Sequence, residues 1–412
     1  MRRPILGFVL LCICASPTAL RAQEFKLFDR AIQVHGFASQ GFVYTDGNNW
    51  LTMNTSQGSG AMTDMGLNIS SQLTDKFRVG AQVYDRNLGQ LGQWHPSLDW
   101  AVADYRCTSW FGIRAGKVKT TLGLYNDSQD LDFLRVFALL PQSVYPTDLR
   151  DATIAHSGGD IYGNFTLPHR LGELSYTAYA GYRNDSIYSG YPYLISQWGT
   201  HLRSLGGLQY GADLRWNTPL RGLLVGASRM NQDISGKGSG LIRLFDPTAG
   251  IGPYYEFSKA SWTNQFYGQY GIRRLQIDAE YRRYLRDQII LNVTSEDITD
   301  VRGWYVAGTY RISKRWKVGS YYSRYTVTDA FGGLLATFIA DQTDTSRPEN
   351  HVYDTAVTAA VGLNRFWDVK VEGHFMNGFA NAMYPDGFYP QQNRQGFQPN
   401  TNALVIKTGF HF

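Results

Sequence analysis

Apolar and polar residues alternate along most of the chain with a period of two. In residues 174–183 the alternation is complete, and residues 275–282 and 353–364 repeat it. Successive side chains of a β-strand point to opposite faces, whereas a helix repeats every 3.6 residues. Each such stretch is therefore predicted to be a strand with one apolar and one polar face. In the first stretch the apolar face carries Leu174, Tyr176, Ala178, Ala180 and Tyr182.

The alternation predicts sixteen strands. The connections between them alternate strictly between long loops and short turns. The strands are placed at residues 31–44, 62–73, 76–86, 97–106, 109–119, 150–167, 171–184, 207–217, 222–232, 257–271, 273–286, 301–313, 316–327, 351–364, 367–378 and 403–412. The long connections cover residues 45–61, 87–96, 120–149, 185–206, 233–256, 287–300, 328–350 and 379–402. A turn at Gly158–Gly159 would split the sixth strand, which leaves that segment the most open to another interpretation.

An even number of antiparallel strands, with short turns at one end and long loops at the other, is the layout of a transmembrane β-barrel. The composition agrees, since the chain has 43 glycines and 27 tyrosines, and only 18% of its residues are charged. The mean hydropathy of −0.30 excludes a bundle of membrane helices. No blade repeat of a soluble propeller is present. The predicted fold class is all-β, a transmembrane antiparallel 16-stranded β-barrel.

Residues 1–22 have the pattern of an export signal peptide. Arg2 and Arg3 precede an apolar stretch at residues 5–14, and a segment rich in small residues leads to a cleavage site near Ala22–Gln23. A twin-arginine signal and lipidation of one of the two signal cysteines are weaker alternatives. Residues 23–412 are predicted to form a single transmembrane barrel domain, with Cys107 as its one cysteine.

The third long connection, residues 120–149, is too apolar for an exposed loop. Its segment 131–140 looks helical and needs a surface to bury against. Folding into the barrel would supply that surface, so we expect this loop to fold inward and narrow the lumen. The apolar residues that carry this inference are Phe133, Leu134, Val136, Phe137, Leu139 and Leu140.

Three segments carry a resemblance to a known family. The last strand, 403–412, alternates and ends in Phe412, and the segments 111–127 and 140–146 flank the third loop. Together they resemble Gram-negative outer-membrane porins, both general and phosphate-selective. The resemblance implies a water-filled channel for passive diffusion of small polar solutes and ions, with residues 120–149 as the constriction loop. It also implies a cell outer-membrane location, contact with lipid and lipopolysaccharide, and a homotrimer.

Charges on the polar strand faces and in the third loop are the candidate pore residues. A charge on the lipid face costs about 2–4 kcal/mol near the midplane, so arginines that alternate with apolar residues are expected in the lumen. Alternatively, each arginine could lie at the rim of the barrel instead of in the lumen. The aspartates could lie in a loop that is exposed to solvent instead of at a constriction. The expected constriction residues are Asp127, Asp130, Asp132, Arg78, Arg86 and Arg114. The further lumen candidates are Arg183, Arg215, Arg282 and Arg311.

The sequence does not favour an enzyme. His156 and Ser157 are adjacent on a strand, so their side chains point to opposite faces, and no G-x-S-x-G turn is present. No metal-ligand spacing, cofactor motif or basic run for nucleic acid is found. A substrate-specific channel for phosphate, a sugar or an organic acid remains the main alternative, and an outer-membrane enzyme or adhesin the weaker one.

Overall fold

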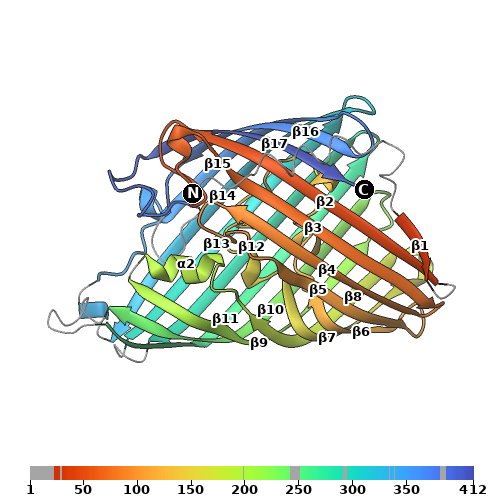
Figure 1. The fold of residues 1–412 in the computed structure, drawn as a ribbon, viewed down its shortest axis with the longest axis horizontal. Helices are drawn as coiled ribbons and strands as arrows, with labels where there is room; N and C mark the ends of the chain where they lie inside the picture. The colour runs from red at the N-terminus through yellow and green to blue at the C-terminus, as the bar shows by residue number, and fades with distance from the viewer. Residues whose placement is uncertain are drawn as a thin grey trace.

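The computed structural model describes residues 23–27, 30–197, 199–241, 251–290, 295–333, 335–337, 339–380 and 387–412, and in them sixteen strands close into one antiparallel barrel (Figure 1). The predicted signal peptide, residues 1–22, lies outside the described residues. The barrel strands are β2 (Arg30–Thr45), β3 (Ser59–Thr74), β4 (Phe77–Leu88), β5 (Ser97–Arg106), β6 (Gly112–Lys119), β7 (Ala155–Thr166), β8 (Glu173–Asn184), β9 (Thr200–Asn217), β10 (Leu223–Leu241), β11 (Ile251–Ile272), β12 (Leu275–Ile290), β13 (Ser295–Arg311), β14 (Trp316–Gly333), β15 (His351–Gly362), β16 (Trp367–Asn377) and β17 (Asn400–His411).

Every barrel strand pairs with its neighbours in the sequence, and β17 returns to β2 to close the ring. Each of the sixteen predicted strands corresponds to one observed strand, so the predicted fold class is confirmed. The short β1 (Gln23–Leu27), which the alternation did not predict, pairs with the start of β2. Short turns join the strands at the end where the chain terminates, here called the short-turn end, and the long loops lie at the opposite, long-loop end.

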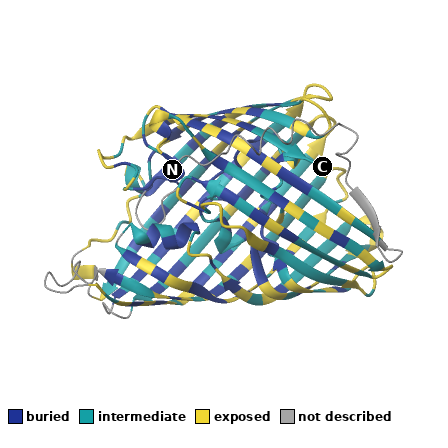
Figure 2. Cartoon of the chain, in the orientation of Figure 1, coloured by how far each residue is buried: buried dark blue, intermediate teal, exposed yellow. Residues whose placement is uncertain are grey.

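Burial alternates along the strands, and Figure 2 shows it as a checked pattern around the wall. The polar face is the buried one. Asp278 and Glu280 of β12 are buried, whereas Ile277, which precedes Asp278, is exposed on the outside. Likewise Val357 is 47% exposed between two buried neighbours on β15. The barrel therefore has an apolar outside, which suits lipid, and a polar inside.

Several strands continue beyond their predicted ends. Strand β11 begins at Ile251 and β13 at Ser295, each six residues before the predicted start at 257 or 301. The added segment of β13, Ser-Glu-Asp-Ile-Thr-Asp, is polar on both faces, so it shows no apolar alternation. In contrast, β7 begins at Ala155 and runs unbroken through Gly158–Gly159.

The expected helical stretch at residues 131–140 is wrong. It contains one 3-10 turn, Asp132–Leu134, and Arg135 is already extended. The backbone N–H groups of Ala138 and Leu139 are instead used in contacts with the barrel wall. Within the described residues the α-helix is α2 (Gly190–Ser196), in the fourth long connection. No helix in the described ranges is long and apolar enough to cross a membrane.

Hydrogen bonds between two loops at the long-loop end connect the chain segments next to β2 and β17, the two strands that close the barrel. The amide Nδ2 of Asn48 donates to the carbonyl of Gln398 at 2.7 Å, and the backbone N–H of Gln398 donates back to the Oδ1 of Asn48 at 2.7 Å. The Asn49 amide in turn donates to the carbonyl of Gln392 at 2.7 Å. We call these three hydrogen bonds the seam clasp. It joins segments more than 340 residues apart directly above the strands that close the barrel.

Candidate functional site

The third loop, residues 120–154, is held by carboxylates that face the barrel interior. The backbone N–H of Leu124 donates to Glu280 of β12 at 3.0 Å. The N–H groups of Ala138 and Leu139 donate to the two oxygens of Glu372 on β16, at 2.9 and 3.1 Å. Glu280 is 3% exposed and Glu372 is fully buried. Since β12 and β16 lie on separate parts of the wall, these bonds hold the loop against the inner face of the barrel at two places.

Two tyrosine hydroxyls also donate hydrogen bonds to Glu280. The hydroxyl of Tyr145, from the loop, donates to this carboxylate at 2.7 Å, and that of Tyr305 on β13 donates at 2.6 Å. Burial, together with the adjacent Glu280, raises the pKa of the Tyr145 hydroxyl well above its usual value. The hydroxyl therefore keeps its proton and remains a donor at every physiological pH.

The apolar residues of the loop bury against the inner wall. Phe137 and Leu140 form a buried cluster with Tyr321 of β14 and Ala356 of β15. The rings of Phe137 and Tyr321 lie 5.2 Å apart. Leu134 is the exception, because it is 60% exposed. The wall thus supplies the surface that the composition of the loop requires.

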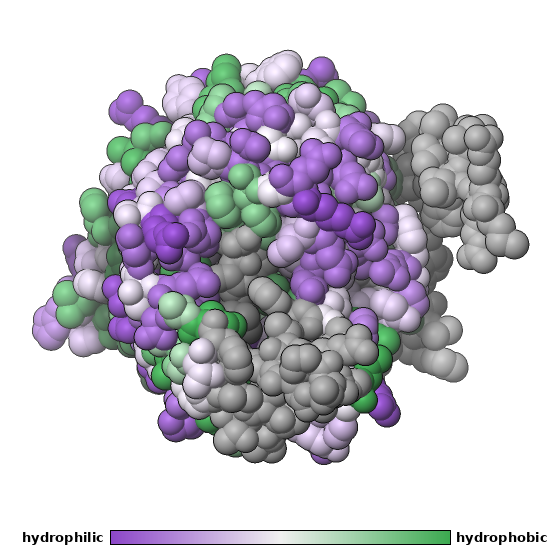
Figure 3. Space-filling model, turned by 90° about the vertical axis from the view of Figure 1, so that its left-hand side faces the viewer, coloured by the Kyte–Doolittle hydropathy of each residue, from purple (hydrophilic) through white to green (hydrophobic). Residues whose placement is uncertain are grey.

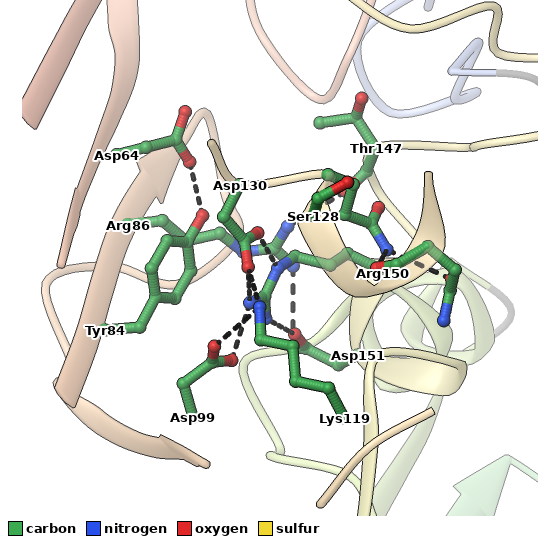
Figure 4. A network of polar contacts seen from close by, with 12 residues as sticks. Asp64, Tyr84, Arg86, Asp99, Lys119, Ser128, Asp130, Thr147, Arg150 and Asp151 are labelled. Carbon is green, nitrogen blue, oxygen red and sulfur yellow. Dashed lines mark hydrogen bonds and ion pairs between the residues drawn. The ribbon is translucent and has the colours of Figure 1, made fainter. Parts of the chain in front are cut away.

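Arg150, from the end of the loop, is the centre of a charge network beside β4, β5 and β6 (Figure 4). It donates to Asp130 of the same loop at 2.5 Å and to Asp99 of β5 at 2.6 Å. Lys119, the last residue of β6, approaches the same two carboxylates at 2.7 and 3.1 Å. The Arg150 guanidinium also lies 4.1 Å from the ring centre of Tyr84. Arg150 also pairs with Asp151 at 3.3 Å, and Asp151 pairs with Arg86 at 3.5 Å. Three cations are therefore matched to three carboxylates, as a buried network requires.

These contacts keep the loop aspartates ionised. Burial alone would raise the pKa of Asp130, but Arg150 and Lys119 lower it well below its usual range. Asp132 is similar, because burial is outweighed by Lys407 of β17 and by Arg135, and its pKa falls to about 2. The loop thus presents fixed negative charge paired with fixed positive charge.

The structure brings three of the six expected constriction residues into this region. Asp130 and Asp132 lie as described, and Arg86 donates to the carbonyl of Thr147 at 2.9 Å. Asp127 is exposed at the start of the loop, outside the Arg150 network.

The other two expected constriction residues lie near the short-turn end. Arg78 is exposed and hydrogen-bonds Ser70, and Arg114 pairs with Asp160 at 2.8 Å. These two arginines are on the polar strand face, but at another height along the barrel.

Two of the four further arginines bind the third loop. Arg215 donates to the carbonyl of Gly123 and Arg282 to that of Val144, both at 2.8 Å, so these two hold the third loop. Arg183 forms a buried pair with Asp185 next to the same loop, and Arg311 lies at the short-turn end.

Sequence reasoning missed the residues that hold the network together. Lys119, Asp99, Arg150, Glu280 and Glu372 were not among the expected residues. Alternation places Glu280 and Glu372 on polar faces, so a search for buried carboxylates as well as arginines would have found them. Arg150 was assigned to the start of a strand, whereas it lies in a 3-10 turn before β7.

An apolar cluster lies between the third loop and the other long loops. It includes Trp50, Leu139, Ile195 and Phe388, all nearly or fully buried. Figure 3 shows the long-loop end, where hydrophilic side chains cover much of the visible surface. Below them, Tyr389 donates its hydroxyl to Asp148 of the third loop at 2.6 Å. The third loop is therefore fixed from the wall and also from the loops above it.

The Asp148–Tyr389 contact predicts a pH dependence. Burial raises the pKa of Asp148 from 3.8 to about 6, although Tyr389 opposes this. The folded loop then holds the proton more tightly than the unfolded loop, so stability from this group falls as pH rises between about 4 and 6. We expect the backbone amides near Tyr389 to be better protected from hydrogen exchange at pH 4.5 than at pH 7.5, after correction for intrinsic exchange.

The variant Asp148→Asn is the control for this prediction. It keeps an oxygen that can accept the Tyr389 hydrogen bond but has no proton to gain, so the difference between the two pH values should vanish. An equal pH difference in both proteins would show that Asp148 is not the titrating group.

The cavities that the third loop lines differ in size. Two of them hold about 40 and 70 Å³. The cavity at the short-turn end holds about 440 Å³, and one among the outer loops about 990 Å³. No cluster of three metal-ligating side chains occurs in the described ranges.

Comparison of the sequence with protein-family models and with curated proteins gives no match. The fold does match solved structures. An anion-selective porin from Comamonas acidovorans is 10% identical, with a TM-score of 0.56 over 93% of this chain and 100% of that one.

Two further solved structures give similar values. OmpF of Salmonella typhi, in complex with daunomycin, is 12% identical, with a TM-score of 0.55 over 95% of this chain and 100% of that one. The trimer form of OmpT, an outer membrane protein of Vibrio cholerae, is 12% identical, with a TM-score of 0.51 over 93% and 99% of the two chains. At these identities the likeness concerns the fold.

Proposed function

We propose that this protein is an outer-membrane porin, a water-filled channel for passive diffusion of small polar solutes and ions. The observation that carries the proposal is the third loop, which Glu280 and Glu372 hold against the inner face of a polar lumen. The loop narrows the lumen and presents paired charges there. Such a charged constriction discriminates solutes by size and by charge. The likeness of the fold to solved porins supports the same function.

The apolar outer surface supports the proposed location and partners. Its apolar residues suit a bilayer, and in a barrel with short turns at one end the long loops face the cell exterior. We therefore place the protein in the outer membrane, in contact with lipid and lipopolysaccharide. A homotrimer is part of the proposal, supported by the trimer form of a protein with the same fold.

The proposal includes no catalysis, and the placement of the one Ser–His pair in the sequence supports this. His156 is buried on the inner face, whereas its neighbour Ser157 is exposed on the other face. Their side chains therefore cannot cooperate as a nucleophile and its base.

Single-channel recording in planar bilayers tests the function. We expect stepwise conductance whose size rises in proportion to salt concentration, as for a diffusion pore. Purified barrel that inserts into the bilayer, shown by heat-dependent mobility on gels, but gives no conductance steps would contradict the proposal.

A substrate-specific channel is a second candidate, favoured by the small cavities beside the third loop. Such a channel has a saturable site for its solute, whereas a general pore does not. Conductance that saturates at low solute concentration would favour this candidate over the general pore.

A further inference from the structure

The cavity at the short-turn end has an unusual balance of charge. It holds about 440 Å³ between the third loop and strands β11 to β14. We call it the short-turn vestibule. A single carboxylate, Asp278, faces it, and that group already accepts hydrogen bonds from Tyr125 and Gln276. The cations that line it are Arg135, Arg273, Arg274, Arg311 and Lys317.

Three of these cations form a row across neighbouring strands. Arg311 of β13 lies directly opposite Lys317 of β14 in the strand register. On its other side, the N–H of Arg311 donates to the carbonyl of Arg274 at 2.9 Å. Neighbouring strands are about 4.8 Å apart, so the three positive residues are adjacent. Like charges directly opposite each other destabilise a sheet.

Protein groups offset this repulsion only in part, because Lys317 interacts with the charge of Asp368 without forming an ion pair with it. Arg135 pairs with Asp132, and Arg274 donates to the carbonyl of Ile312 at 3.2 Å. The side chains of Arg311 and Lys317 form no ion pair or hydrogen bond within the described part of the chain. A bound anion would therefore gain attraction from both and relieve their mutual repulsion.

The third loop adds an exposed apolar side chain to the lining of the vestibule. Leu134 lines it and is 60% exposed, although it lies inside the barrel. Val136, Phe137, Leu140 and Pro141 of the third loop also line the vestibule, but they are buried, so Leu134 is the apolar residue of this segment that a ligand can cover. An apolar side chain exposed to an aqueous lumen gains free energy when a ligand covers it. The cations and the exposed Leu134 together fit a ligand that has both a charged and an apolar part.

We propose that the short-turn vestibule binds small organic anions. The acidic group lies against Arg311 and Lys317, and the apolar part covers Leu134. This inference deepens the proposed function, because it names the class of solute that the pore holds at its short-turn end. It adds the two cations to the constriction as a second determinant of which solutes the pore favours.

Isothermal titration of the detergent-solubilised barrel at low salt tests the proposal with three probes. Benzoate has both a charge and a ring, acetate has the charge alone, and benzyl alcohol has the ring alone. We expect benzoate to bind about tenfold more tightly than acetate, because the ring buries apolar surface. Benzyl alcohol should bind more weakly than benzoate, because it lacks the charge.

Two variants separate the contributions. Arg311→Gln with Lys317→Gln should weaken benzoate about tenfold at low salt, and less at high salt where charges are screened. Leu134→Ser should reduce the preference for benzoate over acetate and leave acetate unchanged. The matched control is Arg170→Gln with Arg221→Gln, which removes two exposed charges from short turns that do not line the vestibule.

Three results would overturn the inference: equal affinity for benzoate and acetate, equal affinity for benzoate and benzyl alcohol, or equal weakening in the control variant. The titration does not depend on conduction. A barrel that binds benzoate but gives no conductance would overturn the proposed function and keep the vestibule, and the reverse result would do the opposite.

Discussion

Replacing residues 121–153 by a tight two-residue turn should raise the single-channel conductance several-fold. Lys119 and Ala155 pair directly in the register of β6 and β7, so a short turn can join the two strands without strain. The change removes the loop that narrows the lumen, while Glu280 and Glu372 become solvated by lumen water. The measurement is conductance in planar bilayers at fixed salt.

Folding of the shortened protein is checked by its heat-dependent mobility on gels. If the shortened barrel is folded and its conductance equals that of the full chain, the third loop does not limit the current. The proposed constriction would then have to be placed among the outer loops instead.

The variant Arg150→Met should lower the free energy of unfolding by about 3–5 kcal/mol, which is the usual cost of leaving a buried charge without its partner. Asp99 and Asp130 would then share Lys119 alone. The loop end would also lose its tie to β5, so we expect a larger and noisier current. Urea unfolding followed by tryptophan fluorescence gives the stability.

The double variant Arg150→Met with Asp99→Asn is the matched control. It leaves the Lys119–Asp130 pair, so charge is balanced again and much of the lost stability should return. If the single and double variants unfold at the same urea concentration, the loss comes from packing of the Arg150 side chain and not from unpaired charge.

The strands were predictable because lipid and lumen water impose their pattern directly on neighbouring residues. Ile277 faces outward and Asp278 inward for reasons that no distant residue alters. Residues 295–300 of β13 lack the apolar alternation, so the pattern did not reveal them as strand and the predicted start came six residues too late. The predicted sites depended on the same rule, which gives the face of a residue but not its height along the barrel.

Arg86 and Arg78 illustrate this limit. Both are on the polar face of β4, yet Arg86 contacts the third loop and Arg78 lies near the short-turn end. The charge network around Asp130 could not be predicted from neighbouring residues in the sequence. Arg150 donates to both Asp130 and Asp99, and these three residues come together only when the loop has folded against the wall. The expected helix at 131–140 failed for a similar reason, since wall groups such as Glu372 bind the N–H groups that a helix would use.

The seam clasp bears on how the chain assembles. The hydrogen bonds of Asn48 and Asn49 to the segment before β17 can form only when the first and last barrel strands have met. Contacts between such distant residues carry a high entropic cost until the intervening chain is ordered. The clasp is therefore a late event in folding, and its formation marks a barrel that has already closed. A chain that stalls before β17 joins would leave these asparagines, and Trp50 beside them, open to proteases and chaperones.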